Sequence, residues 1–356
     1  MKATPTIYTN NNVGLFELPP PSPDWEKTHG TPELDVVAVH GLNGECFRTW
    51  THEEPTGEKT LWLSDLLPHK LPRTRVMTFG YNASVVGNTS VAGVRDNARY
   101  LLNSLRDKRE YDGTHDRPIV FVGHSLGGIV IKQALRMARN EPRLVAVADN
   151  TKGIVFFGTP HRGTDAASWG ELAAKLKSAS YGTRPRSPFF KLLRSNSNDL
   201  MNLSEDFRPI AQNYALVSFV EQNIISKLGF NRVVVAKHSA VMEMPHEEQA
   251  FINGDHSTMC KFSRDPADAV RFNSVWRSIE RAAKGTDARP APSLYDLYQK
   301  FAHGTASGET ATPAKPGAGR IEGSHADQAR PAWSAAPVPE GVRVGGGGGK
   351  VHVYVG

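Results

Sequence analysis

The sequence is poor in cysteine, in long apolar runs and in clustered charge. Its two cysteines, Cys46 and Cys260, form no CxxC pair, which argues against a disulfide framework and against a cysteine-based metal site. No stretch reaches the roughly 18 apolar residues of a membrane-spanning helix, and the N-terminus lacks the apolar run of a signal peptide. The net charge of +6 is spread without a block of like charges, so no nucleic-acid partner is expected. We therefore expect an intracellular protein, cytoplasmic by default, without a metal or a cofactor.

Composition divides the chain near Lys284. We expect one domain over residues 1–283 and a disordered tail over 284–356, because a segment rich in Gly, Pro, Ala, Ser and Thr cannot bury enough apolar surface to fold. Within the tail, residues 293–301 place apolar side chains at helical spacing and predict a short helix. The final six residues, "VHVYVG", have the composition of a strand-addition segment, which would allow self-assembly. An ordinary C-terminus without such a role is favoured.

Short apolar runs alternate with helical patterns through the first 283 residues. Several runs are apolar at consecutive positions, which suits parallel strands that are covered on both faces. The runs span residues 34–41, 75–81, 118–125, 153–160, 214–222 and 231–237, with 13–18 as an additional edge strand. One helical stripe follows Val94, and another opens with Asp265 as N-cap and Pro266 as first helical residue. The alternation predicts an α/β fold with a mostly parallel sheet and helices on both faces.

The stretch "FVGHSLGGIV", residues 121–130, places Ser125 in the pattern G-x-S-x-G. A strand-like run enters the pattern and a helical run leaves it, which is the context of a nucleophile elbow. Gly123, Gly127 and Gly128 would leave room where the strand and the helix pack closely. The free N–H groups at the start of the helix would face a developing oxyanion. We predict that Ser125 is a nucleophile; a structural Gly-Ser turn is the alternative.

A serine nucleophile needs a histidine that accepts its proton and a carboxylate that orients the histidine. On a parallel sheet these groups can follow in the order serine, acid, histidine, each after a later strand. Glu221 ends the second strand after Ser125, and His256 lies in the loop before the last helix. We predict these two residues as acid and base. The competing histidines are His238 and His246, and the competing acids are Asp255, Glu243, Glu247 and Glu248.

The segment "HGLNG", residues 40–44, follows the first strong strand. A glycine turn at this place supplies the second backbone N–H of an oxyanion hole, beside the N–H of the residue after the nucleophile. We predict Leu42, or Gly41 in its place, and Leu126 as the two donors. A tight turn between a strand and a helix, without such a role, is the alternative.

Five segments together resemble a known family. They are "VVAVHGLNG", "FGYNA" (79–83), "GHSLGGIVIKQAL", "FFGTPHRG" (156–163) and "DHSTMCKF" (255–262), in order across residues 13–283. The sequence is similar to the lipase-like serine esterase domain of SERAC-like proteins and to hydrolase domains of fungal NACHT, ankyrin and TPR proteins. The resemblance implies an α/β-hydrolase fold and ester or acyl hydrolysis, with Ser125 as nucleophile and His256 as base. The family usually has an aromatic residue before the acid, whereas Val220 precedes Glu221 here.

The resemblance also bears on substrate and location. Residues 164–212 lie where such enzymes insert a lid; an apolar lid would favour lipid-like esters, and two ordinary core-covering helices are the alternative. Some relatives associate with mitochondria or the endoplasmic reticulum, and peripheral membrane association would be compatible with a lipid-like substrate. We expect a serine hydrolase that acts on ester bonds. The alternative is a signalling module that retains a hydrolase scaffold with little turnover.

Overall fold

The computed structural model describes residues 12–83, 93–161, 197–222, 225–227, 230–232, 235 and 239–286. All of them belong to the first of two units into which the chain divides, residues 1–306. The predicted tail from residue 287 onward, with its helix at 293–301, lies outside the described residues, as do residues 164–196 of the predicted lid. The boundary between domain and tail therefore stays a prediction.

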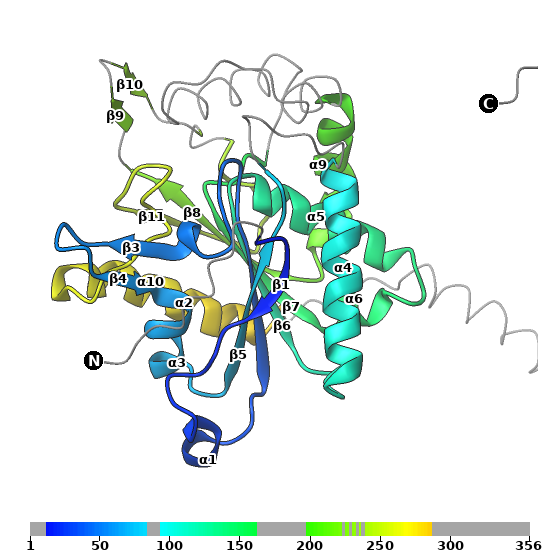
Figure 1. Ribbon diagram of the computed structural model, residues 1–356. Coiled ribbons are helices and arrows are strands. Elements are labelled where there is room, and N and C mark those ends of the chain that lie inside the picture. Colours follow the sequence, from blue (N-terminus) through cyan, green and yellow to red (C-terminus); the bar gives the residue numbers. More distant parts are fainter. Residues whose placement is uncertain are drawn as a thin grey trace, which may run out of the picture. The chain divides into compact units, whose positions relative to one another are not determined.

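Seven described strands form the central sheet in the order β1-β5-β2-β6-β7-β8-β11 (Figure 1). Only β1 runs antiparallel to its neighbour, β5, and the remaining neighbours pair in parallel. The mostly parallel sheet and the edge strand within 13–18 are thereby confirmed. The strands are β1 (Gly14–Glu17), β2 (Leu34–Val39), β5 (Thr74–Gly80), β6 (Ile119–His124), β7 (Thr151–Phe157), β8 (Ala215–Glu221) and β11 (Glu247–Ile252).

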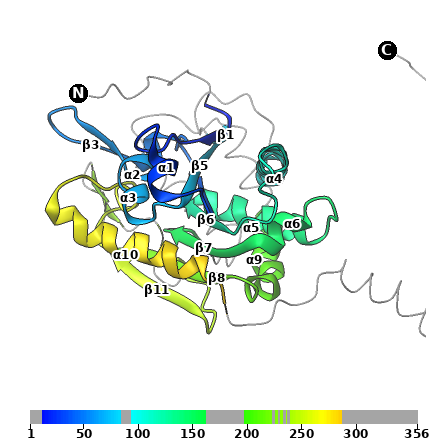
Figure 2. The same cartoon turned by 90° about the horizontal axis from the view of Figure 1, so that it is seen from below.

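Helices cover both faces of the sheet, as predicted (Figures 1 and 2). One face carries α4 (Val94–Tyr111), α5 (Leu126–Arg139), α6 (Val145–Asn150) and α9 (Ser197–Ala211), and the other carries α2 (Trp62–Asp65), α3 (Leu67–Lys70) and α10 (Pro266–Ala283). The predicted cap of α10 is confirmed, because the Asp265 carboxylate accepts a hydrogen bond from the Ala267 N–H at 2.7 Å. The smaller elements are α1 (Trp25–His29), η1 (Arg48–Trp50), and the hairpin of β3 (Thr51–Glu53) and β4 (Lys59–Leu61).

Alternate residues of the strands contribute to two separate hydrophobic cores. In β2, Val37 and Val39 pack in the core that contains residues of α4 and α5. Val36 and Ala38 pack in the core that contains residues of α2 and α10. This period of two, with both faces buried, explains why the central strands read as continuous apolar runs in the sequence.

The described part of the predicted lid is α9. Leu203, Phe207 and Ala211 are buried, and Phe207 and Ala211 belong to the core beneath α4 and α5. This apolar stripe at helical spacing is the pattern of a helix that covers a core. For residues 197–211 the structure therefore favours the alternative of an ordinary core-covering helix.

The prediction of a last core strand at 231–237 is wrong. β10 (Phe230–Arg232) instead pairs with β9 (Ile225–Lys227) in a separate hairpin. β11 instead forms the edge of the central sheet beside β8. It begins with Glu247 and Glu248, so its sequence resembles a polar loop. An edge strand has one neighbour and a partly exposed face, so it tolerates polar residues and its sequence signal is weaker.

The carboxyl ends of β2 and β6 lie at the point where the strand order of the sheet reverses. After β2, the chain forms β5, which is the neighbour of β2 on one side within the sheet. It then crosses over to form β6, which is the neighbour of β2 on the other side. In a parallel sheet, such a reversal opens a crevice outside the carboxyl ends of the two central strands, and ligands bind there. The segment "HGLNG" follows β2 and Ser125 follows β6, so both lie at this reversal of the strand order.

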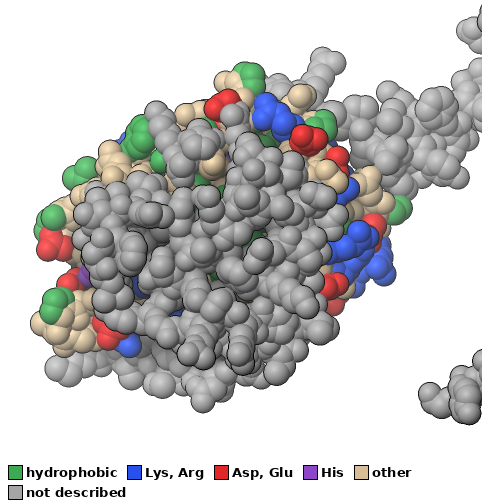
Figure 3. Space-filling view, turned by 90° about the horizontal axis from the view of Figure 1, so that it is seen from above, with side chains coloured by type: hydrophobic (Ala, Val, Ile, Leu, Met, Phe, Trp, Pro, Cys, Tyr) green, Lys and Arg blue, Asp and Glu red, His purple; other side chains and the backbone are tan. Residues whose placement is uncertain are grey.

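Charges of both signs are mixed on the described surface. In the view from above, Lys and Arg side chains and Asp and Glu side chains both occur around the margin of the described part (Figure 3). Several of the exposed charges are paired, as in Arg136 with Asp206 at 2.8 Å.

Lys132 is a fully buried lysine within α5. Its Nζ lies 5.8 Å from the centroid of the Phe207 ring and has no hydrogen-bond partner among the described residues. Burial lowers the pKa of Lys132 to about 7. Between that value and the ordinary lysine pKa of about 10.4, the unfolded chain binds a proton that the folded protein has released. The lysine is therefore most destabilising at pH 7 and below, and its cost falls as the pH rises toward 10.

We expect Lys132→Met to raise the free energy of unfolding by a few kcal/mol near pH 7 and by less near pH 9.5. Urea unfolding of the two proteins at both pH values measures the difference. Lys27→Met is the matched control, because Lys27 is exposed and its replacement should change stability by less than about 0.5 kcal/mol. Equal stability of wild type and Lys132→Met at neutral pH would contradict the prediction.

Candidate active site

Ser125 occupies a strained turn between β6 and α5. Its backbone has φ 52° and ψ −123°, a conformation that non-glycine residues rarely adopt. The turn is held by two backbone hydrogen bonds: the Ser125 N–H donates to the Phe157 carbonyl at 2.8 Å, and the Ser125 carbonyl accepts from the Gly128 N–H at 3.1 Å. The predicted strand–turn–helix context of the G-x-S-x-G pattern is thereby confirmed.

The three glycines of the elbow are required by close packing. A Cβ at Gly127 would lie 2.1 Å from the Val39 carbonyl oxygen, at the end of β2. A Cβ at Gly123 would lie 2.8 Å from the Gly128 Cα, and one at Gly128 would lie 2.2 Å from the Thr159 hydroxyl. These contacts let α5 approach β6 and its neighbours closely, which brings the start of the helix directly behind Ser125.

The loop that follows β2 lies against Ser125. A Cβ at Gly41 would be only 2.7 Å from the Ser125 Cβ, so a side chain at Gly41 would collide with the serine. Leu42, in this loop, and Leu126, directly after the serine, carry the two backbone N–H groups that the sequence predicts as oxyanion donors. Asn43, the next residue in the loop, has φ 55° and donates its N–H to the Ala83 carbonyl at 3.0 Å. The two predicted oxyanion donors therefore lie in the segments that flank Ser125, and no described residue accepts a hydrogen bond from either N–H group.

Hydrogen bonds of the His40 side chain hold this loop against Tyr81. The His40 Nε2 accepts a hydrogen bond from the Tyr81 N–H at 3.1 Å, so its Nδ1 carries the proton and donates to the Gly41 carbonyl at 2.9 Å. The two rings stack with centroids 4.4 Å apart, and the Tyr81 hydroxyl donates to the His40 carbonyl. Burial lowers the pKa of His40 to about 4, which keeps the ring neutral and this tautomer in place.

Glu221 and His256 form a buried pair beside β8 and β11. The His256 Nδ1 is 3.7 Å from the Glu221 Oε2, and the two side chains are 3% and 0% exposed. The other carboxylate oxygen, Oε1, accepts a hydrogen bond from the Val235 N–H at 2.6 Å. Ile252, the last residue of β11, is the register partner of Glu221, so the strand pairing brings the loop with His256 next to the acid. The predicted acid and base are thus brought together.

His256 lies in a tight, buried environment. Gly158, at φ 52°, packs against the ring, because a Cβ there would be 3.0 Å from both the His256 Nδ1 and the Met259 sulfur. Burial, together with His124, lowers the pKa of His256 well below 6.5, so the imidazole is neutral near pH 7 and can accept a proton. Among the described residues, neither the His256 Nε2 nor the Ser125 hydroxyl has a hydrogen-bond partner.

The competing bases lie away from Glu221 or outside the described residues. The His246 Nε2 is 3.2 Å from the Ala211 carbonyl, at the far end of α9, and His238 is not among the described residues. Glu243 is exposed, and the other competing acids have partners elsewhere. Asp255 accepts from the Thr258 N–H, Glu247 accepts from the Ser218 hydroxyl, and Glu248 pairs with Arg281.

Two residues of the site had no part in the sequence prediction. His124 precedes the serine, and its Nε2 donates to the His256 carbonyl at 2.8 Å. Gly158, in the segment "FFGTP", makes room for the His256 ring. In the sequence, His124 is visible only as a histidine inside the elbow pattern and Gly158 only as a glycine at the end of a strand. Neither residue type indicates that its partner in the fold is His256.

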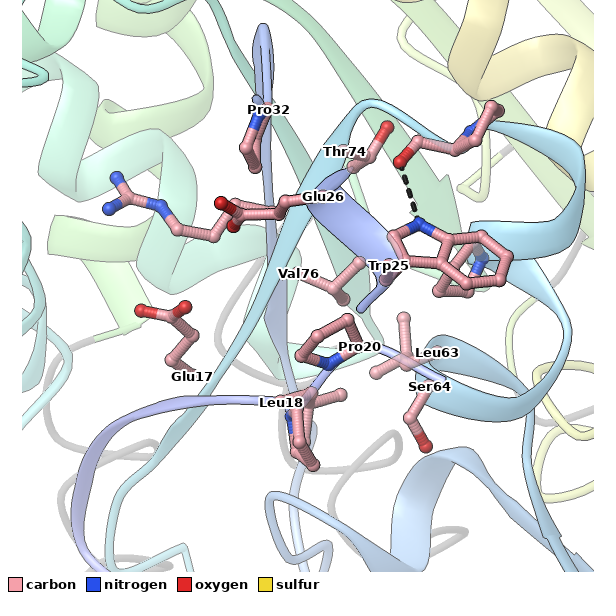
Figure 4. Close-up of a pocket in the computed structure, with 14 residues that line it drawn as sticks. Glu17, Leu18, Pro20, Trp25, Glu26, Pro32, Leu63, Ser64, Thr74 and Val76 are labelled. Carbon is pink, nitrogen blue, oxygen red and sulfur yellow. Dashed lines mark hydrogen bonds between the residues drawn. The ribbon is translucent and has the colours of Figure 1, made fainter. Parts of the chain in front are cut away.

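A small pocket lies at the opposite edge of the sheet (Figure 4). It is bordered by Trp25, Leu63 and the start of β5 at Thr74, and the Trp25 indole N–H donates to the Pro72 carbonyl. Its volume of about 30 Å³ holds roughly one water molecule, so it does not suit an organic substrate. It contains none of the predicted site residues.

The described residues contain no group of three His, Cys, Asp or Glu side chains that is placed to hold a metal ion. Burial raises the pKa of Cys46 and of Cys260 to about 12, so neither thiol is a nucleophile at neutral pH. None of the described helices has the length and hydropathy needed to cross a membrane.

Several known proteins are similar to this chain. Protein SERAC1 of Bos taurus is 28% identical over 229 residues, which are 61% of this chain and 34% of that protein. Protein SERAC1 of Danio rerio is 29% identical over 278 residues, or 73% of this chain and 40% of that protein. The chain therefore spans about two fifths or less of the length of these curated relatives. The lipase BlEst2 of Bacillus licheniformis aligns with a TM-score of 0.48 and 17% identity, covering 76% of this chain and 98% of that one.

A family description matches the segment that holds the elbow and the acid. "Putative serine esterase (DUF676)" matches residues 33–240, which include Ser125 and Glu221 and end before His256. The match covers more than half of the 356 residues. The protein therefore belongs to the family described as "Putative serine esterase (DUF676)", and it has the α/β-hydrolase fold that the sequence predicted.

Proposed function

We propose that this protein hydrolyses carboxylic esters through an acyl-enzyme intermediate. Ser125 is the nucleophile, His256 is the general base and acid, and Glu221 orients His256. The observation that carries the proposal is the strained backbone of Ser125, which lies against the loop after β2 and near a buried histidine–carboxylate pair. A non-glycine residue in such a conformation costs roughly 1–3 kcal/mol, and proteins retain that cost mainly at reactive sites.

The proposed reaction has two halves. The Ser125 hydroxyl attacks the ester carbonyl while His256 Nε2 accepts the hydroxyl proton, and the Leu126 and Leu42 (or Gly41) N–H groups stabilise the tetrahedral oxyanion. The intermediate collapses as His256 gives that proton to the leaving alcohol. Water then attacks the acyl-serine with His256 again as base, and the carboxylic acid leaves as the serine is regenerated.

The electrostatics of the buried pair suit these steps. His256 is neutral before the attack because burial holds its pKa well below 6.5. When it becomes an imidazolium, the carboxylate of Glu221 at 3.7 Å stabilises the new charge in a low-dielectric surrounding, where the attraction is stronger than in water. Catalytic hydrogen bonds are often long without substrate and tighten when substrate binds, so this distance is compatible with the role.

Labelling with a fluorophosphonate probe tests the proposal, because the probe reacts covalently with an activated serine. We expect the wild type to be labelled and Ser125→Ala and His256→Ala to be unlabelled. Ser257→Ala and His115→Ala are the matched controls, since both residues are exposed and lie outside the pair. Folded wild-type protein that fails to react would rule the proposal out. A panel of p-nitrophenyl esters of increasing chain length then tests whether lipid-like acyl groups are preferred.

A further inference from the structure

His124 links the nucleophile elbow directly to the base. It is the last residue of β6 and the residue before Ser125, and its side chain is buried. Its Nε2 lies 2.8 Å from the His256 carbonyl oxygen. A carbonyl oxygen can only accept, so Nε2 carries the proton and His124 is the donor. His124 is joined to Ser125 by a peptide bond, and its side chain is joined to the His256 backbone by one hydrogen bond. His124 therefore connects the backbone of Ser125 to the backbone of His256.

The surroundings of His124 restrict the orientation of its ring. The Trp50 ring lies edge-on at a centroid distance of 6.5 Å, and the His256 ring is tilted against it at 5.0 Å. On the side of the oxyanion loop, a Cβ at Gly41 would come within 3.2 Å of the His124 Nδ1. The ring thus lies between the loop after β2 and the loop that carries the base.

Filling space does not explain a histidine at this position. The His124 Nδ1 is buried and has no hydrogen-bond partner among the described residues, which carries a desolvation cost. An aliphatic or aromatic side chain would fill the same space between Trp50 and His256 without that cost. The presence of a polar ring in this buried place points to its N–H donor as the useful feature. Burial also lowers the pKa of His124 to about 4, so the ring is neutral near pH 7 and keeps a single donor.

We propose that His124 is a positioning residue that sets the place of His256 relative to Ser125 through its hydrogen bond to the His256 carbonyl. This inference rests on the proposed function, since it concerns the geometry of the same reaction. Because the bond ends on the backbone of the base itself, its loss lets the loop of residues 253–260 shift against the elbow. A misplacement of about 1 Å between reacting groups costs on the order of 10²-fold in rate.

Two kinds of variant separate the donor from the bulk of the side chain. His124→Gln keeps an N–H donor near the position of Nε2, whereas His124→Phe and His124→Leu keep apolar volume without a donor. We expect the donor-free variants to lower kcat for a short p-nitrophenyl ester by about 10²-fold, with KM changed by less than about threefold, because His124 is argued to act through His256 and not on the substrate. We expect His124→Gln to recover most of kcat.

Thermal unfolding of each variant and its rate of fluorophosphonate labelling complete the test. The labelling rate should fall in parallel with kcat, since both require the base to activate the serine. Donor-free variants with wild-type kcat would overturn the inference, as would His124→Gln being as slow as His124→Phe. A donor that proved necessary for folding itself, with both apolar variants unfolded and His124→Gln folded, would also overturn the positioning role. A wild type that does not react at all would instead refute the proposed function.

Discussion

Replacing Glu221 with glutamine is expected to lower kcat by about 10⁴-fold while leaving the protein folded. The Glu221 Oε1 accepts from the Val235 N–H, so the carbonyl oxygen of a glutamine is held at that position. The glutamine NH₂ group then takes the place of Oε2 and faces the His256 Nδ1. A donor at that place forces Nδ1 to act as the acceptor, and the ring proton moves to Nε2. An imidazole that already carries a proton on Nε2 cannot take one from Ser125.

Glu248→Gln is the matched control for this substitution. Glu248 lies on β11, next to β8, and its carboxylate pairs with Arg281 at the surface. We expect this control to retain kcat within about twofold, because exposed ion pairs contribute little. Steady-state kinetics with a p-nitrophenyl ester, together with thermal unfolding, measure both variants. A folded Glu221→Gln with kcat within tenfold of wild type would remove Glu221 from the proposed mechanism.

The elbow and the position of Glu221 could be predicted from sequence because both are local features at strand ends. The apolar run before Ser125, the helical run after it and the three glycines fix a turn without reference to distant residues. Glu221 ends a β-branched run, and the carboxyl ends of parallel strands meet at one edge of the sheet. His256 was found by its place before the last helix, although the strand that delivers it is β11 and not the predicted run at 231–237.

The remaining parts of the site depend on contacts that are distant in sequence. The bond from His124 to the His256 carbonyl spans 132 residues, and neither residue type encodes the other. The 3.7 Å separation of Glu221 and His256 depends on the register of β8 with β11, a strand whose edge position weakens its apolar signal. The burial of Lys132 could not be predicted for the same reason. A lysine in a helical pattern suggests an exposed helix face, but in the fold Phe207 of α9 lies over this part of α5.

Among the proposed substitutions, removing the carboxylate of Asp35 is expected to lower the free energy of unfolding the most. Asp35 lies at the start of β2 and is fully buried. It accepts two hydrogen bonds from Arg75, at 2.9 and 2.7 Å, and further hydrogen bonds from Arg109 and Arg117. Arg75 and Arg109 are themselves buried, and Arg75 also pairs with Asp112. The carboxylate thereby connects β2 with β5, α4 and the segment that enters β6.

Asp35→Ala leaves these guanidinium groups buried with one carboxylate fewer, and we expect it to lower the free energy of unfolding by about 3–5 kcal/mol. Asp24→Ala is the control: its pair with Lys27 is exposed, so its loss should cost less than about 1 kcal/mol. Urea unfolding measures both, and a loss below 1 kcal/mol for Asp35→Ala would contradict the expectation. Because Asp35 is at the amino end of β2 and the loop beside Ser125 is at its carboxyl end, the folded variant should keep wild-type kcat. Stability and catalysis would then be separable along a single strand.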